Sequence, residues 1–414
     1  MASKSYCFVV PRYFEGIAGG AETLMGSLAL ELHARGDRVE IVSTCARDNR
    51  TWANEMPAGE ELLGGIGGIK LTRFPVDERN LDRWVPLQLS ISEGNPVAPD
   101  DQITWLAESV NSRPLYAYLL QEQSRFDAVF FGPYLFGTTF WGALLNPQCS
   151  VLIPCLHDES YAYLDVIVAM FREVRGCLFN AAPEMHLARS LYGDIPGDVV
   201  GMGFELPSRE SIVELKPYFT DPAPYILYLG RKETGKNVQL LIDSFCTAKD
   251  EGLIAAEVKL VILGGGSFSD LHRPQALARG DIIDLPHLSE IEKQRLLRHA
   301  LYLCQPSTNE SFSIVMMEAW MVETPVVVHA KCAVTKQHVI DSKGGLYFAS
   351  PQDLGGVTEY YLTHPEGRLQ HAQAGRAYVE REYAWSAVLE RFDRTMSKLF
   401  AQQLEVASTL SINP

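Results

Sequence analysis

The chain has 414 residues and a net charge of −15, and 47 % of its side chains are apolar and 21 % charged, as is typical of soluble globular proteins. This length predicts two or three domains rather than one compact core. Both halves are acidic, and no apolar stretch is long enough to span a membrane or form a secretion signal. We therefore expect a cytoplasmic protein that binds neither nucleic acid nor a broad anionic lipid surface.

The eight cysteines contain no C-x-x-C pair, and most of them lie inside apolar runs. This pattern is typical of buried thiols in a reducing compartment rather than of disulfides or zinc ligands. Because no Cys/His cluster is present either, the sequence predicts no metal site.

The first half of the chain alternates short β-branched runs with helical stretches. The run at 6–11 is followed by a helical pattern at 19–36, in which Leu24, Leu28 and Leu32 recur every four residues. Further strands are expected at 38–44, 69–76, 127–133, 150–156, 176–181 and 198–204. This alternation predicts a buried, largely parallel sheet. The polar and aromatic segment 77–125 interrupts it as an insertion.

The same alternation restarts after the loop at 216–224. The predicted fold class is therefore α/β, with two doubly wound, Rossmann-like domains. We expect an N-terminal domain at 1–210, a C-terminal domain at 211–390, and a C-terminal helix and tail at 391–414 that return to the first domain. Ligands of such sheets bind at the carboxyl ends of the strands, so the cleft between two facing sheets is the expected site.

Glycines and cations follow several of these strands. Gly19 and Gly20 open the first helix, where an anion is favoured, and Gly265 lies in a glycine run after a later strand, although a plain turn explains that run equally well. Arg231 and Lys236 follow the first strand of the second half and could neutralise a diphosphate. Two solvated loop cations are the alternative.

Two kinds of acid–base group complete the candidate site. His157, with Asp158 beside it, ends a strand, although a lone histidine is more often structural. Glu310 and Glu318 lie eight positions apart around an apolar stretch. If that stretch is one helix, the two carboxylates point in similar directions, but two solvated glutamates on one face are also ordinary.

Together these motifs resemble the retaining glycosyltransferases of family four. The resemblance covers nearly the whole chain and rests on GGAE at 19–22, LYLGRKETGKN at 227–237, LVILGGG at 260–266, PSTNESFSIVMMEAW at 306–320 and TPVVV at 324–328. It implies the GT-B architecture, in which two Rossmann-like domains face a central cleft.

The resemblance also implies a role for each site residue. Glu310 would bind hydroxyls of the donor sugar, and Glu318 would bind the ribose. Arg231 and Lys236 would hold the diphosphate, and His157 would contact the donor sugar near the reacting centre. The remaining substrate contacts implied are Gly19, Gly20, Gly265 and the helix start formed by Ser311, Phe312, Ser313 and Ile314.

The chain departs from the family in three places. Ser313 and Glu323 stand where the family usually has glycine. In addition, the family's usual glycine-rich segment, which contains a glutamate, is replaced here by residues 330–339. Ser313 could therefore crowd the diphosphate or offer it a further hydroxyl.

The sequence thus predicts a retaining hexosyltransferase that needs no metal and no cofactor. Its donor would be a nucleoside-diphosphate sugar, and a sugar or lipid-linked acceptor would bind the first domain, including Trp84 and Trp105 of the insertion, although we expect one of these two in the core. The alternatives are a GT-B nucleotide-sugar epimerase or hydrolase, and an inactive nucleotide-binding scaffold.

Overall fold

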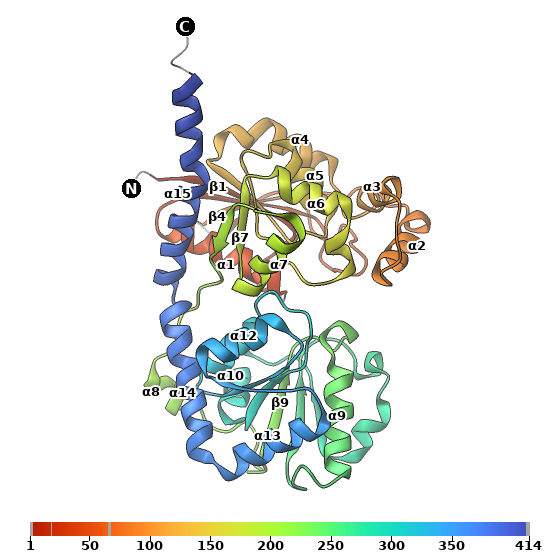
Figure 1. The fold of residues 1–414 in the computed structure, drawn as a ribbon, viewed down its shortest axis with the longest axis vertical. Helices are drawn as coiled ribbons and strands as arrows, with labels where there is room; N and C mark the ends of the chain where they lie inside the picture. The colour runs from red at the N-terminus through yellow and green to blue at the C-terminus, as the bar shows by residue number, and fades with distance from the viewer. Residues whose placement is uncertain (1–2, 18, 65–67, 411–414) are drawn as a thin grey trace. The chain divides into compact units, whose positions relative to one another are not determined.

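The apolar runs form two separate sheets in the computed structural model, which describes residues 3–17, 19–64 and 68–410 (Figure 1). One compact unit comprises residues 1–203 and 385–414, and the other comprises residues 204–384. The chain therefore passes between the units at 203/204 and at 384/385, whereas the predicted boundaries lay at 210/211 and 390/391. The prediction of an α/β chain with two doubly wound domains is confirmed.

The sheet of the first unit has eight strands in the order β3-β4-β2-β1-β5-β6-β7-β8, and only β3 runs antiparallel to its neighbour. Its strands are β1 (Ser5–Arg12), β2 (Arg38–Thr44), β3 (Gly59–Leu63), β4 (Ile69–Phe74), β5 (Ala128–Phe131), β6 (Ser150–Leu152), β7 (Gly176–Phe179) and β8 (Gly197–Val199). At the centre of the sheet, Tyr6 of β1 lies opposite Val39 and Ala128. The central strands are buried because helices cover both faces, as expected for a parallel sheet.

The helices of the first unit lie between or beside its strands in the sequence. They are α1 (Gly20–Ala34), α2 (Leu81–Ser92), α3 (Pro99–Ala107), α4 (Arg113–Glu122), α5 (Gly137–Leu145), α6 (Asp165–Glu173), α7 (Ala182–Tyr192) and α15 (Trp385–Leu410), with 3-10 turns at Gln123–Arg125 and Ser160–Tyr163. In α1 the buried residues include Leu24, Leu28 and Leu32, as their spacing predicts. Helix α15 packs against β7 and β8, and Arg391 donates to the carbonyl of Val200.

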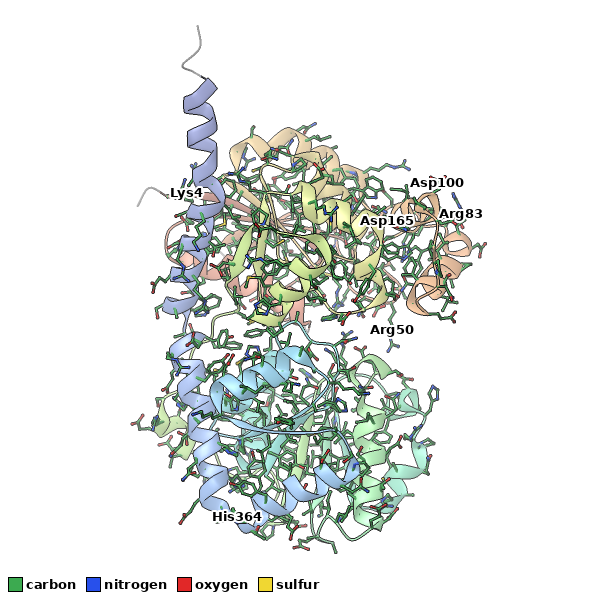
Figure 2. All side chains as sticks on the ribbon, viewed as in Figure 1. Lys4, Arg50, Arg83, Asp100, Asp165 and His364 are labelled. Carbon is green, nitrogen blue, oxygen red and sulfur yellow. The ribbon has the colours of Figure 1, made fainter. Side chains whose placement is uncertain are left out.

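The predicted insertion forms α2, α3 and α4 between β4 and β5. Figure 2 labels Arg83 on α2, Asp100 on α3 and Asp165 on α6. Gln102 of α3 donates to Asp165, which ties the insertion to α6. Trp105 is a core residue that is 2 % exposed and stacks on Tyr161.

The sheet of the second unit has six parallel strands in the order β11-β10-β9-β12-β13-β14. They are β9 (Tyr225–Leu229), β10 (Lys259–Leu263), β11 (Ile282–Leu285), β12 (Tyr302–Gln305), β13 (Val326–His329) and β14 (Gly345–Phe348). The helices are α8 (Arg209–Val213), α9 (Val238–Asp250), α10 (Glu290–His299), α11 (Ile314–Met321), α12 (Ala333–Ser342), α13 (Pro351–Thr363) and α14 (Pro365–Glu382), with 3-10 turns at Thr234–Lys236, Phe268–Leu271 and Pro274–Arg279. The switch point of this sheet lies between β9 and β12, where the strand order reverses.

Five of the eight cysteines are buried thiols, namely Cys7, Cys45, Cys177, Cys304 and Cys332. Burial raises the pKa of Cys7, Cys177 and Cys304, so these thiols stay protonated. Among the described helices, none is both long and apolar enough to span a bilayer.

Candidate functional site

The loops after β9, β10 and β12 share one edge of the second sheet because the three strands run parallel. Arg231 follows β9, and its exposed guanidinium lies 3.1 Å from Glu233. Gly264 follows β10 with φ +140°, and a Cβ there would lie 2.1 Å from the carbonyl oxygen of Gly230. At Gly265 a Cβ would meet nothing within 4 Å, so the backbone of this residue is open to a ligand.

The buried side chain of Lys232 connects these loops. It is 3 % exposed, and its ammonium lies 2.6 Å from Asp284 and donates to the carbonyls of Gly264 and Leu285. Its own amide donates to the carbonyl of Gly265. One buried lysine therefore fixes the strand ends of β9, β10 and β11, and sequence reasoning missed it because its partners are distant in the chain.

Lys236 and Glu310 meet at this edge. The Nζ of Lys236 lies 2.7 Å from Glu310 Oε1, and the two side chains are 26 % and 9 % exposed. The structure thus joins the residue predicted to bind the diphosphate to the residue predicted to bind the sugar. Both remain near the surface, where a ligand can reach them.

Glu310 and Glu318 do not share one helix, so the single-helix geometry considered for this stretch does not apply, and a helix begins between the two residues. Ser313 takes φ 74°, a left-handed conformation, and α11 begins only at Ile314. Glu310 therefore belongs to the loop before the helix, whereas Glu318 lies inside it. Ser313 is 6 % exposed, and its Oγ accepts a hydrogen bond from Gln305 at the end of β12.

The first amides of α11 lack a side-chain cap, since Ser313 makes no capping hydrogen bond to them. Unpaired N–H groups and the helix dipole favour an anion at this end. The residues predicted to line it are Ser311, Phe312, Ser313 and Ile314. Phe312 is buried and stacks parallel to Phe204, so its contribution to a ligand would come from its backbone.

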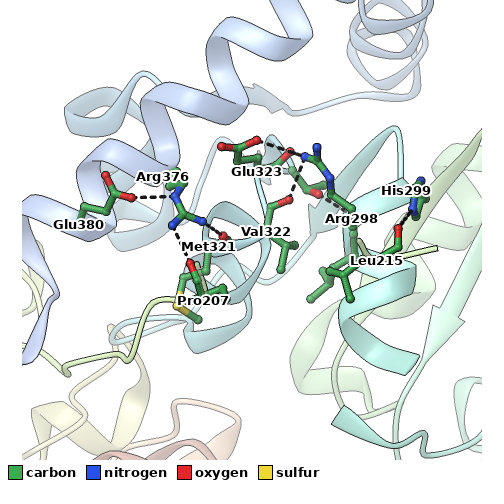
Figure 3. Close-up of polar contacts among 11 residues, drawn as sticks. Pro207, Leu215, Arg298, His299, Met321, Val322, Glu323, Arg376 and Glu380 are labelled. Carbon is green, nitrogen blue, oxygen red and sulfur yellow. Dashed lines mark hydrogen bonds and ion pairs between the residues drawn. The ribbon is translucent and has the colours of Figure 1, made fainter. Parts of the chain in front are cut away.

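Arginines hold the opposite end of α11 (Figure 3). Arg376 donates to the carbonyl of Met321 at 2.6 Å and to that of Pro207 at 2.8 Å. Arg298 donates to the carbonyls of Val322 and Glu323, both at 3.2 Å. These cations satisfy the last carbonyls of the helix and complement the negative end of its dipole. These contacts fix the carboxyl end of α11 and so limit movement of the whole helix, including its amino end.

Glu318 forms the second lysine–glutamate pair of the site. Lys293 of α10 lies 2.8 Å from Glu318 Oε1 and also 2.8 Å from Glu290 Oε2. Burial raises the pKa of the Glu318 carboxyl, and Lys293 opposes this rise. Lys293 is a further site residue that the sequence did not reveal.

In the first unit, Gly19 precedes α1 and Gly20 begins it, at the carboxyl end of β1. A Cβ on Gly20 would meet nothing within 4 Å, so the backbone here is approachable. Arg12 ends β1 and lies 2.7 Å from Glu22 in the first turn of α1. This pair places a mostly buried cation beside the predicted phosphate loop.

His157 lies in the loop after β6, beside Glu159. Its Nδ1 lies 3.6 Å from Glu159 Oε1, and the same oxygen accepts a hydrogen bond from the buried Tyr134 at 2.9 Å. Burial raises the pKa of Glu159, but the interactions with His157 and the hydrogen bond from Tyr134 together outweigh this, so the net shift is downward. Glu159 therefore lies on the Nδ1 side of the His157 ring.

A buried carboxylate supports this loop. Glu184 is 1 % exposed and accepts hydrogen bonds from the amides of Leu156, at 2.7 Å, and Asn180, at 2.5 Å. It therefore links the ends of β6 and β7, next to His157. Burial raises the pKa of Glu184 to about 8, although the backbone hydrogen bonds limit the rise.

The predicted site residues are therefore divided between the two units. Arg231, Lys236, Gly265, Glu310 and the start of α11 lie on the second unit, and Gly19, Gly20 and His157 lie on the first. Within the second unit, contacts join Lys236 to Glu310, while Arg231 pairs with its neighbour Glu233.

Comparisons with known proteins agree with this arrangement. Residues 216–378 match the family model described as Glycosyl transferases group 1. The D-inositol 3-phosphate glycosyltransferase of Streptosporangium roseum is 26 % identical over 409 residues, covering 91 % of this chain and 87 % of that protein. The enzyme of the same name from Xylanimonas cellulosilytica is 29 % identical over 174 residues, covering 39 % of each chain.

Solved structures share the fold. Sucrose-phosphate synthase from Thermosynechococcus elongatus has a TM-score of 0.69 and 15 % identity, covering 96 % of this chain and all of that one. Anabaena HepE in complex with UDP-glucose has a TM-score of 0.66 and 15 % identity, covering 95 % of this chain and 100 % of that one.

Two doubly wound sheets give the chain the GT-B fold, and the family match over residues 216–378 indicates a glycosyltransferase of that class. Residues 216–378 match the group 1 glycosyltransferases of that class, and the chain as a whole is similar to the family-four enzymes that its motifs resemble.

Proposed function

We propose that the chain transfers a hexosyl group from a nucleoside-diphosphate sugar to a hydroxyl acceptor with retention of the anomeric configuration, in glycan or glycoconjugate biosynthesis. The observation that carries this proposal is the Lys236–Glu310 pair at the start of α11. The pair brings a cation that could bind a diphosphate against a carboxylate that could bind a sugar, and Glu310 lies in the loop that leads into α11.

The donor would lie along the carboxyl edge of the second sheet. Arg231, Lys236 and the amides at the start of α11 would stabilise the charge that develops on the departing diphosphate. Glu310 would accept hydrogen bonds from sugar hydroxyls and Glu318 from the ribose, because an ionised carboxylate accepts two O–H donors. His157 would contact the donor sugar through its imidazole, near the reacting centre.

These groups supply enough positive charge that we propose transfer without a metal ion or another cofactor. Uridine is the first nucleoside to test, because HepE was solved with UDP-glucose. The acceptor would be a sugar, a lipid-linked sugar or, as the name of the Streptosporangium roseum relative suggests, a phosphorylated cyclitol. The five buried thiols support a reducing, cytoplasmic location.

The test is turnover of UDP- and GDP-sugars with a panel of these acceptors, with the product anomer assigned by NMR. Retention is expected. Release of free sugar or an isomer from donor alone would indicate the hydrolase or epimerase, and failure to bind either nucleotide would refute the proposal.

A matched pair of variants sharpens the test. Lys236→Met should weaken UDP binding about tenfold or more, because a charge-assisted contact is lost. Lys259→Met removes a lysine that also lies 2.7 Å from a carboxylate, Asp221, but at the amino edge of the same sheet. That control should bind UDP like the parent.

A further inference from the structure

Lys293 reaches across from α10 to α11. Its side chain is only 19 % exposed, and its ammonium lies between the carboxylates of Glu290, one turn earlier in α10, and Glu318 of α11, at 2.8 Å from each. The pair with Glu290 alone would leave the lysine on the surface of its own helix. The contact with Glu318 instead places the ammonium between α10 and α11.

Glu318 needs such a partner more than Glu290 does. Its side chain is 21 % exposed against 66 % for Glu290. Burial raises the pKa of Glu318, and Lys293 is the group that lowers it, both by charge and by hydrogen bonding. A protonated carboxyl would offer ribose hydroxyls one good acceptor oxygen, whereas the ionised form offers two.

The geometry also limits where the carboxylate can point. Lys293 holds Oε1, and the opposite end of α11 is held by Arg298 and Arg376. Both the helix and the side chain are therefore fixed before a ligand arrives. The same device occurs at Glu310, which Lys236 holds at 2.7 Å.

We propose that Lys293 is the positioning residue for ribose recognition, holding the Glu318 carboxyl group where it can bind the two ribose hydroxyls of the nucleotide. This inference rests on the proposed function, since Glu318 must be the ribose-binding group. Lys293 acts through Glu318 and need not touch the nucleotide. Replacing Lys293 should therefore lower the affinity only for ligands that carry ribose hydroxyls.

The experiment compares UDP with 2′,3′-dideoxyuridine diphosphate by calorimetry, using the guanosine pair if the parent binds GDP instead. Lys293→Met should weaken UDP about tenfold and leave the dideoxy ligand nearly unchanged. Lys293→Arg should restore most of the UDP affinity. In combination with Glu318→Ala, Lys293→Met should have no further effect, because the group on which it acts is already gone.

Glu290→Gln is the matched control. It removes the other ion pair of Lys293 and leaves the contact with Glu318, so UDP affinity should stay within about twofold of the parent. Lys293→Gln, which keeps a donor of similar length, serves if the methionine variant unfolds. It should fall between the parent and Lys293→Met.

Three outcomes overturn the inference. Parental UDP binding by the folded Lys293 variants means that Glu318 needs no partner. Equal weakening of UDP and its dideoxy analogue means that the lysine acts elsewhere. A parent that binds the two ligands equally, or binds no nucleoside diphosphate, removes the ribose role of Glu318 itself, and in the latter case the proposed function fails too.

Discussion

Glu310→Gln should bind a nucleoside diphosphate more tightly than the parent while turning over the full donor more slowly. A diphosphate that recruits Lys236 must compete with Glu310, whose carboxylate lies 2.7 Å from the ammonium. The neutral amide is a weaker competitor. Because the two side chains are 26 % and 9 % exposed, the pair is worth about 0.5–1 kcal/mol, so affinity should rise roughly two- to fivefold.

Calorimetry with UDP measures the first effect, and initial rates with the donor sugar measure the second. Turnover should fall at least about tenfold, because the amide holds the sugar hydroxyls less well as the bond breaks. Asp221→Asn breaks the pair with Lys259, also 2.7 Å long, and should change neither quantity.

Weaker UDP binding by Glu310→Gln would refute this reasoning. It would show that the carboxylate supports the bound nucleotide instead of competing with it, for example by keeping Lys236 in place. Unchanged turnover would show that Glu310 does not hold the sugar.

Three further predictions follow from other parts of the structure. Glu323→Gly should raise the free energy of unfolding by about 0.5 kcal/mol, and the Tm slightly, because relief of the left-handed φ of 55° outweighs a partly exposed contact with Arg298 at 3.4 Å; a lower Tm would contradict this. The pKa of Glu184 is raised from 4.5 to about 8, so unfolding releases a proton between these values and stability falls as the pH rises through them. Relative to Glu184→Gln, the parent should therefore lose up to roughly 1.4 kcal/mol per pH unit between pH 5 and 8 in urea titrations, and parallel curves would refute the assignment. Transfer should survive EDTA, and activity that is lost and then restored by Mg²⁺ or Mn²⁺ would show that the diphosphate site is wrongly assigned.

The strands were predictable where they are apolar on both faces. The run at 6–11 is buried throughout in β1, and helices on both sides of the sheet require that composition. The sequence did not predict strand β3, because four of its five residues are exposed, as is common for an edge strand. Strand β14 was also not predicted, because it has only four residues between two helices and shows no clear alternation of apolar and polar side chains.

The candidate site was predictable as a set of charges after strands, but not as a set of partners. Lys236 and Glu310 lie 74 positions apart, and Lys293 and Glu318 lie 25 apart, so no local spacing reveals either pair. The spacing of Glu310 and Glu318 could not show where the helix begins, since the left-handed Ser313 gives no signal in the composition. Only the resemblance, in which glycine usually stands there, indicated a special backbone.

The buried thiols give each unit its own native reporter of local opening. Cys7 and Cys177 lie in the first sheet and Cys304 lies in the second, and all three side chains are at most 1 % exposed. A thiol reagent can reach them only when the surrounding strands separate, so modification rates measure the opening of each unit without an engineered label. Mass spectrometry of the labelled peptides, with and without UDP, would show whether the nucleotide stabilises the second unit alone. In that case, labelling would become slower at Cys304 and stay unchanged at Cys7 and Cys177.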